Sequence, residues 1–200
     1  MKTRMPFLIK HVSLLLLLLL VLLTGCSLGG RIYEKYDQVQ AARRYELDLN
    51  YRFFERRSPM LNMEQTIVKE VTPKGRNCTV YDALVLNSLS YQVKDELFII
   101  IDDEVFKPAV TSLEYDNSRE IQEKSEEVMR ADSSTVKVVT GYTENNKKIT
   151  RFSYSLDTSM IDGLRNATTV LLRYYAGPDM ITIKLKGLKL KKLKKLIEKD

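Results

Sequence analysis

Residues 44–53 read RYELDLNYRF, and apolar and polar side chains alternate strictly along this stretch. One set of alternate positions is apolar or aromatic throughout: Tyr45, Leu47, Leu49, Tyr51 and Phe53. The other set is polar throughout: Arg44, Glu46, Asp48, Asn50 and Arg52. Successive side chains of a strand point to opposite faces, so this period of two predicts a half-buried β-strand rather than a helix over 36–57.

Shorter patterns of the same kind continue along the chain. They predict strands over the ranges 66–71, 84–93, 97–101, 113–115, 136–142, 150–156, 170–174 and 181–185. Residues 97–101 are apolar at every position, which predicts a central strand covered on both faces. Leu89, Tyr91 and Val93 are predicted to share one face of the 84–93 strand.

Turn residues and one charged segment separate the later strands. Asp102-Asp103-Glu104 predicts a tight turn. Asn145-Asn146 predicts the turn of a hairpin over 136–156, because asparagine tolerates a positive φ. The first strand of that hairpin is expected to place Val136, Val138, Thr140 and Tyr142 on one face. Residues 116–134 are rich in charge and poor in apolar residues, which predicts a mobile excursion with a helical turn or two around 121–129.

Two segments have a helical pattern instead. Asp157 or Thr158 caps a short helix whose predicted buried side is Met160, Ile161 and Leu164. Residues 188–198 predict an amphipathic helix, with leucines on one side and lysines mostly on the other. The elements add up to about eight or nine strands, a short internal helix and a C-terminal amphipathic helix. The predicted fold is mainly β, as an antiparallel β-sandwich or an open barrel.

The N-terminus has the layout of an export signal. Lys2, Arg4 and Lys10 precede an unbroken apolar run over 14–23, which is too short to cross about 30 Å of hydrocarbon as a helix. The run ends in Leu23-Thr24-Gly25-Cys26. This tetrapeptide resembles the lipobox of bacterial lipoproteins, with small residues at Thr24 and Gly25 before the cysteine.

The resemblance implies cleavage before Cys26 and attachment of lipid to that cysteine. It divides the chain into a signal peptide (1–25), a lipidated cysteine with a flexible tether (26–30) and one β-rich domain (31–200). Several acyl chains anchor a protein stably to a membrane. Ser27 follows the cysteine, which by the sorting rule of some Gram-negative lipoproteins favours the outer membrane. We therefore expect an exported protein that contacts the membrane through lipid on Cys26.

Composition narrows the chemistry of the mature chain. The only histidine is His11, inside the predicted signal, so triads and zinc sites that need imidazole are not expected. Cys78 is the remaining thiol, and a small buried apolar role is favoured over a reactive one. We expect no metal and no cofactor. The formal charge of +6 falls to about +3 once the signal's three basic residues leave, so nucleic acid is not an expected partner.

A few residues remain as candidate contacts. The acidic cluster Asp102, Asp103 and Glu104 is interpreted as a solvated hairpin tip rather than a catalytic or Ca²⁺ site. Ser134 and Lys137 match the SxxK spacing but lack its companion motifs. Candidate surface contacts are the aromatics and lysines Tyr33, Tyr36, Tyr175, Lys191, Lys192 and Lys195. For the lysines, docking of the helix on the sheet is favoured over contact with an anionic membrane.

These observations favour a non-enzymatic cell-envelope lipoprotein that displays a binding or assembly domain at the membrane surface. The expected partner is another envelope protein or an unidentified ligand. One alternative is a hydrolase of envelope glycans or peptides that uses carboxylates or a Ser-Lys pair. Another is a purely structural envelope component.

Overall fold

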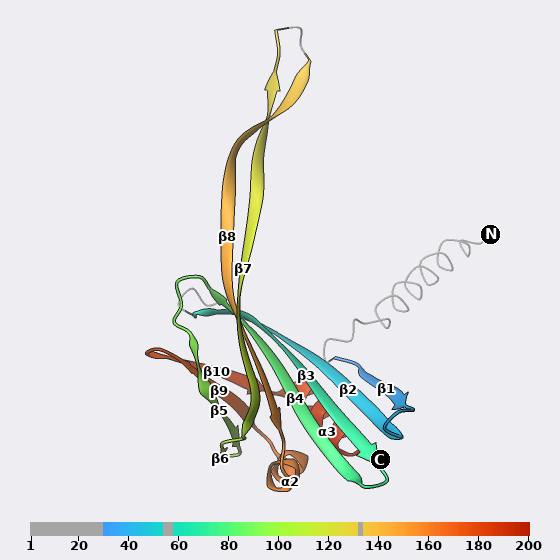
Figure 1. Ribbon diagram of the computed structural model, residues 1–200. Helices are drawn as coiled ribbons and strands as arrows, with labels where there is room; N and C mark the ends of the chain where they lie inside the picture. Colours follow the sequence, from blue (N-terminus) through green and yellow to red (C-terminus); the bar gives the residue numbers. More distant parts are fainter. Residues whose placement is uncertain (1–29, 54–57, 132–133) are drawn as a thin grey trace, which may run out of the picture.

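The computed structural model describes residues 30–53, 58–131 and 134–200. The described chain is mainly β, with ten strands in two antiparallel sheets and two short helices (Figure 1). The larger sheet has the order β1-β2-β3-β4-β8-β7 and curls into a half-barrel, and the smaller has the order β10-β9-β5-β6. The predicted fold class is confirmed, although the described residues hold ten strands instead of eight or nine.

The large sheet contains β1 (Ile32–Asp37), β2 (Ala42–Arg52), β3 (Met60–Thr72), β4 (Gly75–Asn87), β7 (Val110–Met129) and β8 (Thr135–Ser155). The small sheet contains β5 (Val93–Ile101), β6 (Glu104–Phe106), β9 (Val170–Ala176) and β10 (Asp179–Leu185). The helices are α2 (Thr158–Asn166) and α3 (Gly187–Ile197). Residues 1–29, which include the predicted signal and Leu23, Thr24, Gly25 and Cys26, lie outside the described residues.

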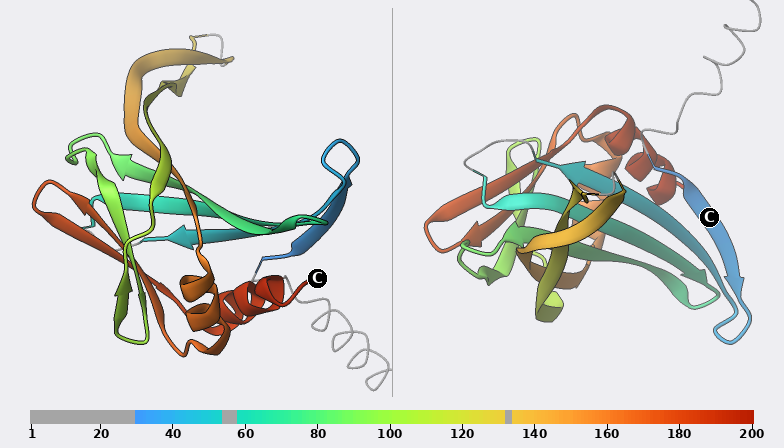
Figure 2. Two further views of the ribbon diagram at one scale, coloured as in Figure 1. Left: turned by 60° about the horizontal axis from the view of Figure 1, so that its bottom comes forward. Right: turned by 90° about the horizontal axis from the view of Figure 1, so that it is seen from above.

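The core lies between the inner faces of the two sheets and under both helices (Figure 2). Strand β2 contributes the predicted alternation, with Tyr45, Leu47, Leu49 and Tyr51 all buried. Across the core, Leu97, Ile99 and Ile101 of β5 are buried. The alternation of residues 44–53 therefore predicted both the strand and the face that packs.

The neighbouring positions of β5 correct one prediction. Phe98 and Ile100 are only half-buried, so the strand is fully covered on one face and partly on the other. β5 lies between β9 and β6, which agrees with an inner position in the sheet. Tyr175 of β9 covers part of the outer face, with its ring 6.0 Å from that of Phe98 in an edge-on contact.

Both predicted helices form. The carboxylate of Asp157 caps α2 by accepting a hydrogen bond from the amide of Met160 at 2.8 Å. Met160 and Leu164 of this helix are buried, whereas Ile161, predicted to share their side, is only half-buried. In α3 the buried side is Leu190, Leu193, Leu196 and Ile197, and this helix packs against β2 and α2. The leucines of the C-terminal helix dock on the body, as the favoured interpretation predicted.

The prediction of one strand over 84–93 is wrong. β4 ends at Asn87, and a turn follows in which the amides of Leu89 and Ser90 donate to the side-chain and main-chain oxygens of Asn87. Leu89 is 94% exposed and Tyr91 61% exposed, so neither shares a buried face with Val93. Asparagine competes for local backbone hydrogen bonds in this way, which ends the strand.

The strands predicted over 136–142 and 150–156 both belong to β8, but the mobile excursion and the turn at Asn145-Asn146 are wrong, because β7 and β8 are two long strands that pair with each other. Residues 116–129 of the predicted excursion belong to β7, and Asn145 and Asn146 lie within β8, opposite Glu120 and Arg119. The hairpin turn lies instead near residue 130, where the amide of Arg130 donates to the carbonyl of Ser134 at 2.7 Å. No side chain of β7 is buried, so no apolar period marks this strand in the sequence.

The prediction that Val136, Val138, Thr140 and Tyr142 share one face is also wrong, because the pairing of β7 with β8 shifts register between them. Val138 pairs with Glu126 and Tyr142 pairs with Glu123, so Thr140 is an extra residue in β8. Such a bulge moves the following side chains to the other face of the ladder. Val138 and Tyr142 therefore lie on opposite faces of the hairpin instead of on one.

Candidate functional site

Part of the β7–β8 hairpin extends beyond the body; its described residues, 117–131 and 134–146, are here called the arm. β8 pairs with β4 only from Lys147 onward, so the arm's strands have each other as neighbours and no third strand (Figure 1 and Figure 2). At about 3.3 Å per residue the arm's β7 strand spans roughly 40 Å. The arm therefore has two open edges and two uncovered faces.

Apolar side chains lie along this uncovered hairpin. Ile121 is 57% exposed, Met129 71% and Tyr142 68%, and all three lie on the face that continues the core-facing side of the large sheet. Val128 and Val138 are exposed on the opposite face, close to the tip. Large apolar side chains gathered on a projecting element are typical of a surface that contacts another molecule.

The β7 strand of the arm is acidic. Between 117 and 129 it carries four carboxylates and two cations: Glu120, Glu123, Glu126, Glu127, Arg119 and Lys124. Arg119 makes an ion pair with Glu144 across the ladder at 2.7 Å, whereas Glu123, Glu126 and Glu127 have no ion pair within the described residues. The distal half of β7 therefore presents unpaired negative charge along an open edge.

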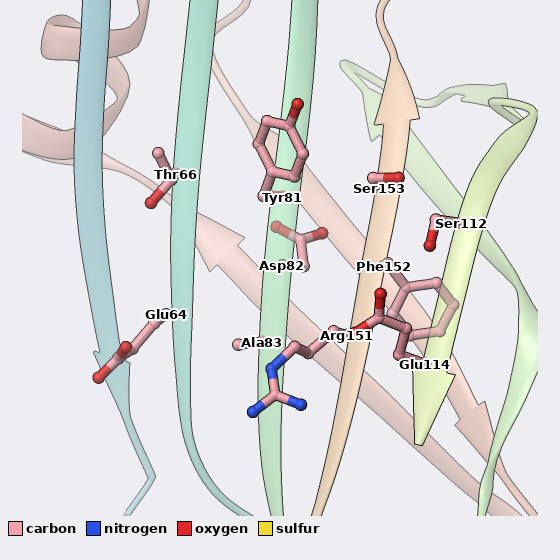
Figure 3. Close-up of a pocket in the computed structure, with 10 residues that line it drawn as sticks. All are labelled: Glu64, Thr66, Tyr81, Asp82, Ala83, Ser112, Glu114, Arg151, Phe152 and Ser153. Carbon is pink, nitrogen blue, oxygen red and sulfur yellow. The ribbon is translucent and has the colours of Figure 1, made fainter. Parts of the chain in front are cut away.

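A hollow of about 380 Å³ lies at the base of the arm, on the outer face of the large sheet (Figure 3). Its polar lining comes from neighbouring strands: Glu64, Thr66, Tyr81, Ser112, Glu114, Arg151 and Ser153. The strand register places Glu64, Ala83, Arg151 and Glu114 in one row across β3, β4, β8 and β7. Three strand spacings separate the backbones of the two glutamates by about 14 Å. Catalytic carboxylate pairs of glycosidases lie about 5–9.5 Å apart, so this row gives the carboxylate alternative no support.

Directly behind the hollow, Asp82 points into the core. Tyr174 donates a hydrogen bond from its hydroxyl to Asp82 at 2.6 Å, and the Gln65 amide donates one at 2.9 Å. The hydroxyl of Tyr51 donates to Gln65 at 3.2 Å. Burial raises the pKa of Asp82 to about 6, and the bonds from Tyr174, Gln65 and Tyr154 oppose that shift only in part. This network is enclosed, so it serves the packing of the two sheets.

Sequence reasoning missed Asp82 although a signal was present. Cys78, Val80, Leu84 and Leu86 are the inward positions of β4, and Asp82 interrupts that apolar set. A charged residue at an inward position is rare unless hydrogen bonds satisfy it.

The acidic residues 102–104 form the predicted turn, with φ values of 43° at Asp102 and 76° at Asp103. The carboxylate of Asp102 accepts hydrogen bonds from the amides of Thr168 and Thr169, at 2.9 and 2.7 Å. Those bonds hold the pKa of Asp102 below its usual value. Asp103 and Glu104 point to solvent. Asp102 thus joins the turn after β5 to the segment before β9. No group of three or more metal-ligating side chains occurs among the described residues.

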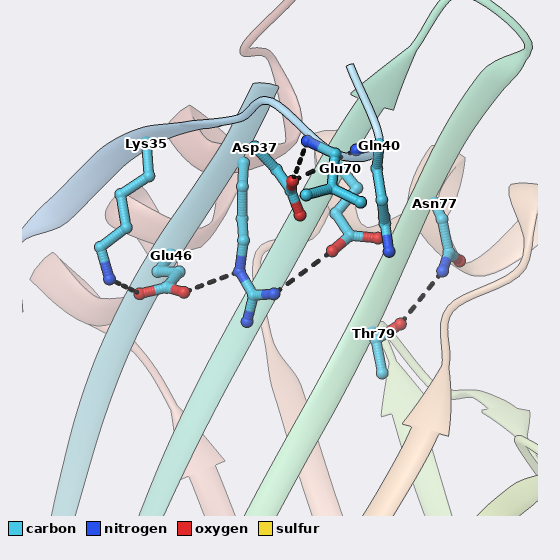
Figure 4. Close-up of polar contacts among 9 residues, drawn as sticks. Lys35, Asp37, Gln40, Glu46, Glu70, Asn77 and Thr79 are labelled. Carbon is cyan, nitrogen blue, oxygen red and sulfur yellow. Dashed lines mark hydrogen bonds and ion pairs between the residues drawn. The ribbon is translucent and has the colours of Figure 1, made fainter. Parts of the chain in front are cut away.

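The remaining candidates are spread over the surface. Tyr33 and Tyr36 are exposed on the edge strand β1, beside a charged ladder in which Glu46 bridges Lys35 and Arg44 (Figure 4). Lys191 and Lys195 are exposed on α3 and Lys192 is half-buried. Tyr175 lies on the outer face of the small sheet, whereas β1 is the edge strand of the large sheet. The structure does not gather these residues into one site.

Cys78 is buried and unpaired. Burial raises the pKa of its thiol to about 11, against the opposing effect of Lys69, so it is an apolar residue at neutral pH. Ser134 directly precedes β8 and Lys137 lies within its first residues, whereas the SxxK motif opens a helix. No helix among the described residues is both long and apolar enough to cross a membrane.

Comparison with protein-family models, curated proteins and solved structures found no match. Inference about function therefore depends on the geometry of this chain.

Proposed function

We propose that this protein is a non-enzymatic lipoprotein of the cell envelope, and that its arm binds an extended basic segment of another envelope protein. Lipid on Cys26 would hold the body at the membrane, with the outer membrane favoured. The observation that carries the proposal is the arm, a two-stranded hairpin with open edges that projects from a well-packed body.

The open edge of β7 favours a polypeptide partner. β7 is the terminal strand of its sheet, so its outward N–H and C=O groups form an unpaired row. An extended peptide satisfies such a row by adding as a further strand. Isolated two-stranded hairpins are marginally stable in water, and a third strand with apolar contacts stabilises them. Ile121 and Met129 would lie beneath alternate side chains of the added strand.

The charge of β7 favours a basic partner. Glu123, Glu126 and Glu127 follow one another along β7 and make no ion pair within the described residues, although Lys137 is the register partner of Glu127 and Lys124 lies beside Glu123 in the chain. Like charges placed opposite each other destabilise strand pairs, whereas opposite charges stabilise them and steer association. A second copy pairing β7 with β7 would oppose these carboxylates to one another, so self-pairing along this edge is disfavoured.

Site-specific crosslinking in cells tests the proposal. A photo-crosslinking residue replaces Gln122 or Lys124 in the full chain, and the crosslinked peptides are sequenced by mass spectrometry. We expect one partner segment with an excess of lysine and arginine. Charge reversal at Glu123, Glu126 and Glu127 to lysine should lower the yield at least about 10-fold.

The matched control reverses three exposed acids outside the arm, Glu34, Glu104 and Glu198, and should leave the yield unchanged. Cys26→Ser tests the anchor, because loss of the membrane position should also reduce capture. The proposal fails if the reversed and control variants capture equally, or if the captured peptides carry no basic excess.

A further inference from the structure

A second hollow lies at the opposite end of the molecule from the arm, where α2 and α3 meet the ends of β3 and β4 (Figure 1). Its volume is about 400 Å³, within the range of small-molecule sites. The strands contribute Lys69, Arg76, Asn77 and Cys78, and α3 contributes Ile197. Lys69 and Cys78 are register partners at the inward-facing positions where the apolar core ends.

One face of α2 forms the other wall. Thr158, Ile161, Asp162 and Arg165 line the hollow, with the spacing i, i+3, i+4 and i+7. Residues at this spacing lie above one another on a helix surface. The wall is therefore a continuous helical face, apolar at Ile161 and basic at Arg165.

Three cations surround this space. Lys69 is 6% exposed, and its ammonium donates to the carbonyls of Ile197 and Lys199, the former at 2.6 Å. These bonds use two of its three donors. Burial, followed by repulsion from Arg76, lowers the pKa of Lys69. An anion placed among Lys69, Arg76 and Arg165 would relieve that repulsion.

The carboxylates near these cations are weak competitors. Arg76 pairs with Asp200 at 2.7 Å and Arg165 pairs with Asp162 at 2.7 Å. The side chains in both pairs are about half exposed, and exposed pairs contribute little because water screens them. Each guanidinium also has donors beyond those in its pair, and a planar fork of donors suits carboxylate and phosphate groups.

The remaining lining is apolar. Ile197 and Cys78 are buried, Ile161 is half-buried, and the thiol stays uncharged because burial raises its pKa. The hollow is thus lined both by cations and by apolar side chains. That pairing matches a ligand with an acidic head and a short apolar body.

We propose that this hollow binds a small anionic amphiphile, with its carboxylate or phosphate head on Arg76, Arg165 and Lys69 and its apolar body against Ile161 and Ile197. This site is independent of the arm and of the partner proposed for it. Its ligand can be a lipid-derived chain or a soluble metabolite, because both offer the same head and body.

Isothermal titration of the full chain in nanodiscs of neutral lipid tests the site, with octanoate, octyl phosphate, octanol and inorganic phosphate as probes. We expect saturable 1:1 binding of octanoate or octyl phosphate. The Arg76→Gln/Arg165→Gln variant should bind at least about 10-fold more weakly, since two charge-assisted contacts are lost. The matched control, Lys191→Gln/Lys195→Gln, removes two exposed cations from α3 away from the hollow and should bind as the parent does.

Three results would overturn the site. The first is that neither octanoate nor octyl phosphate binds saturably. The second is that octanol binds as tightly as these anions, and the third is that both double variants lose binding equally. Inorganic phosphate that binds as tightly as octyl phosphate would overturn the role of the apolar wall. Competition between octyl phosphate and a phosphatidic-acid vesicle then separates a lipid source from a soluble one.

Discussion

Two halves of the same strand behave differently in this molecule. Residues 147–155 of β8 lie between β4 and β7 and bury Thr150, Phe152 and Tyr154, whereas residues 135–146 pair only with β7 and bury no side chain. The backbone ladder is continuous across both halves. Residues 147–155 differ in having a second neighbouring strand, β4, and cover from the small sheet, which shows that the pairing of two strands alone does not make a core.

The largest expected difference between the two halves of β8 is in the free energy of unfolding, when one side chain in each half is shortened to alanine. Phe152→Ala should lower the free energy of unfolding by about 3–5 kcal/mol, because Phe152 is 2% exposed and packs on the ring of Tyr174. Val138→Ala, in the arm, should change it by less than about 0.5 kcal/mol. Urea denaturation of both variants measures the difference, and equal losses would show that the arm shares the core's cooperativity.

The next effect concerns buried and exposed carboxylates. Asp82 has a folded-state pKa of about 6 against an ordinary value of 3.8, so the folded state binds its proton more tightly than the unfolded state. Stability from this group is therefore full below pH 3.8 and is lost as the pH rises through 6. The loss is on the order of 2–3 kcal/mol. Asp82→Asn should flatten that part of the profile, whereas Glu126→Gln in the arm should leave it unchanged.

Unfolding midpoints measured in urea at pH 4, 5, 6 and 7.5 provide the readout. If the unfolding midpoints of the unmodified protein and of Asp82→Asn change with pH in parallel, Asp82 does not titrate in this range. The substitution keeps the side-chain shape and an acceptor for Gln65, so a folded variant is expected.

The smallest effect is removal of the arm itself. Replacing residues 119–146 with Asn-Gly joins Ser118 to Lys147, which are register partners, through a two-residue hairpin turn. The free energy of unfolding should change by less than about 1 kcal/mol, because no arm residue belongs to the core and loop length contributes weakly. A loss of several kcal/mol on denaturation would show that the body depends on the arm.

This contrast also explains how far sequence reasoning reached. The alternation at Tyr45–Tyr51 depends on burial and the N-terminal cap of α2 at Asp157 depends on a local hydrogen bond, and both elements were predicted correctly. β7 has no buried residue, so its charged residues produced no period to detect. Asn145 and Asn146 carry turn propensity, but pairing with β7 overrides it.

The candidate sites were harder to predict for the same reason. The second hollow brings Arg165 to Lys69 and Arg76, which precede it by about 96 and 89 positions, and these residues meet only where α2 packs against the ends of β3 and β4. The arm's open edges follow from strand order, which local patterns do not specify. Only the interruption of an apolar set by Asp82 could be detected in the sequence itself.

The bond from Lys69 to the carbonyl of Ile197 spans 128 positions of the chain, and the hydroxyl of Tyr45 reaches the carbonyl of Asp200 over 155. Contacts this distant in sequence must overcome a large loop-closure entropy before they stabilise anything, and such topologies fold slowly. Strands β2 and β3 emerge early in synthesis but gain their cover from α3 only when residues 190–199 are available. The body therefore gains its complete cover only after α3 docks, which makes the C-terminal helix the last element needed to close the core.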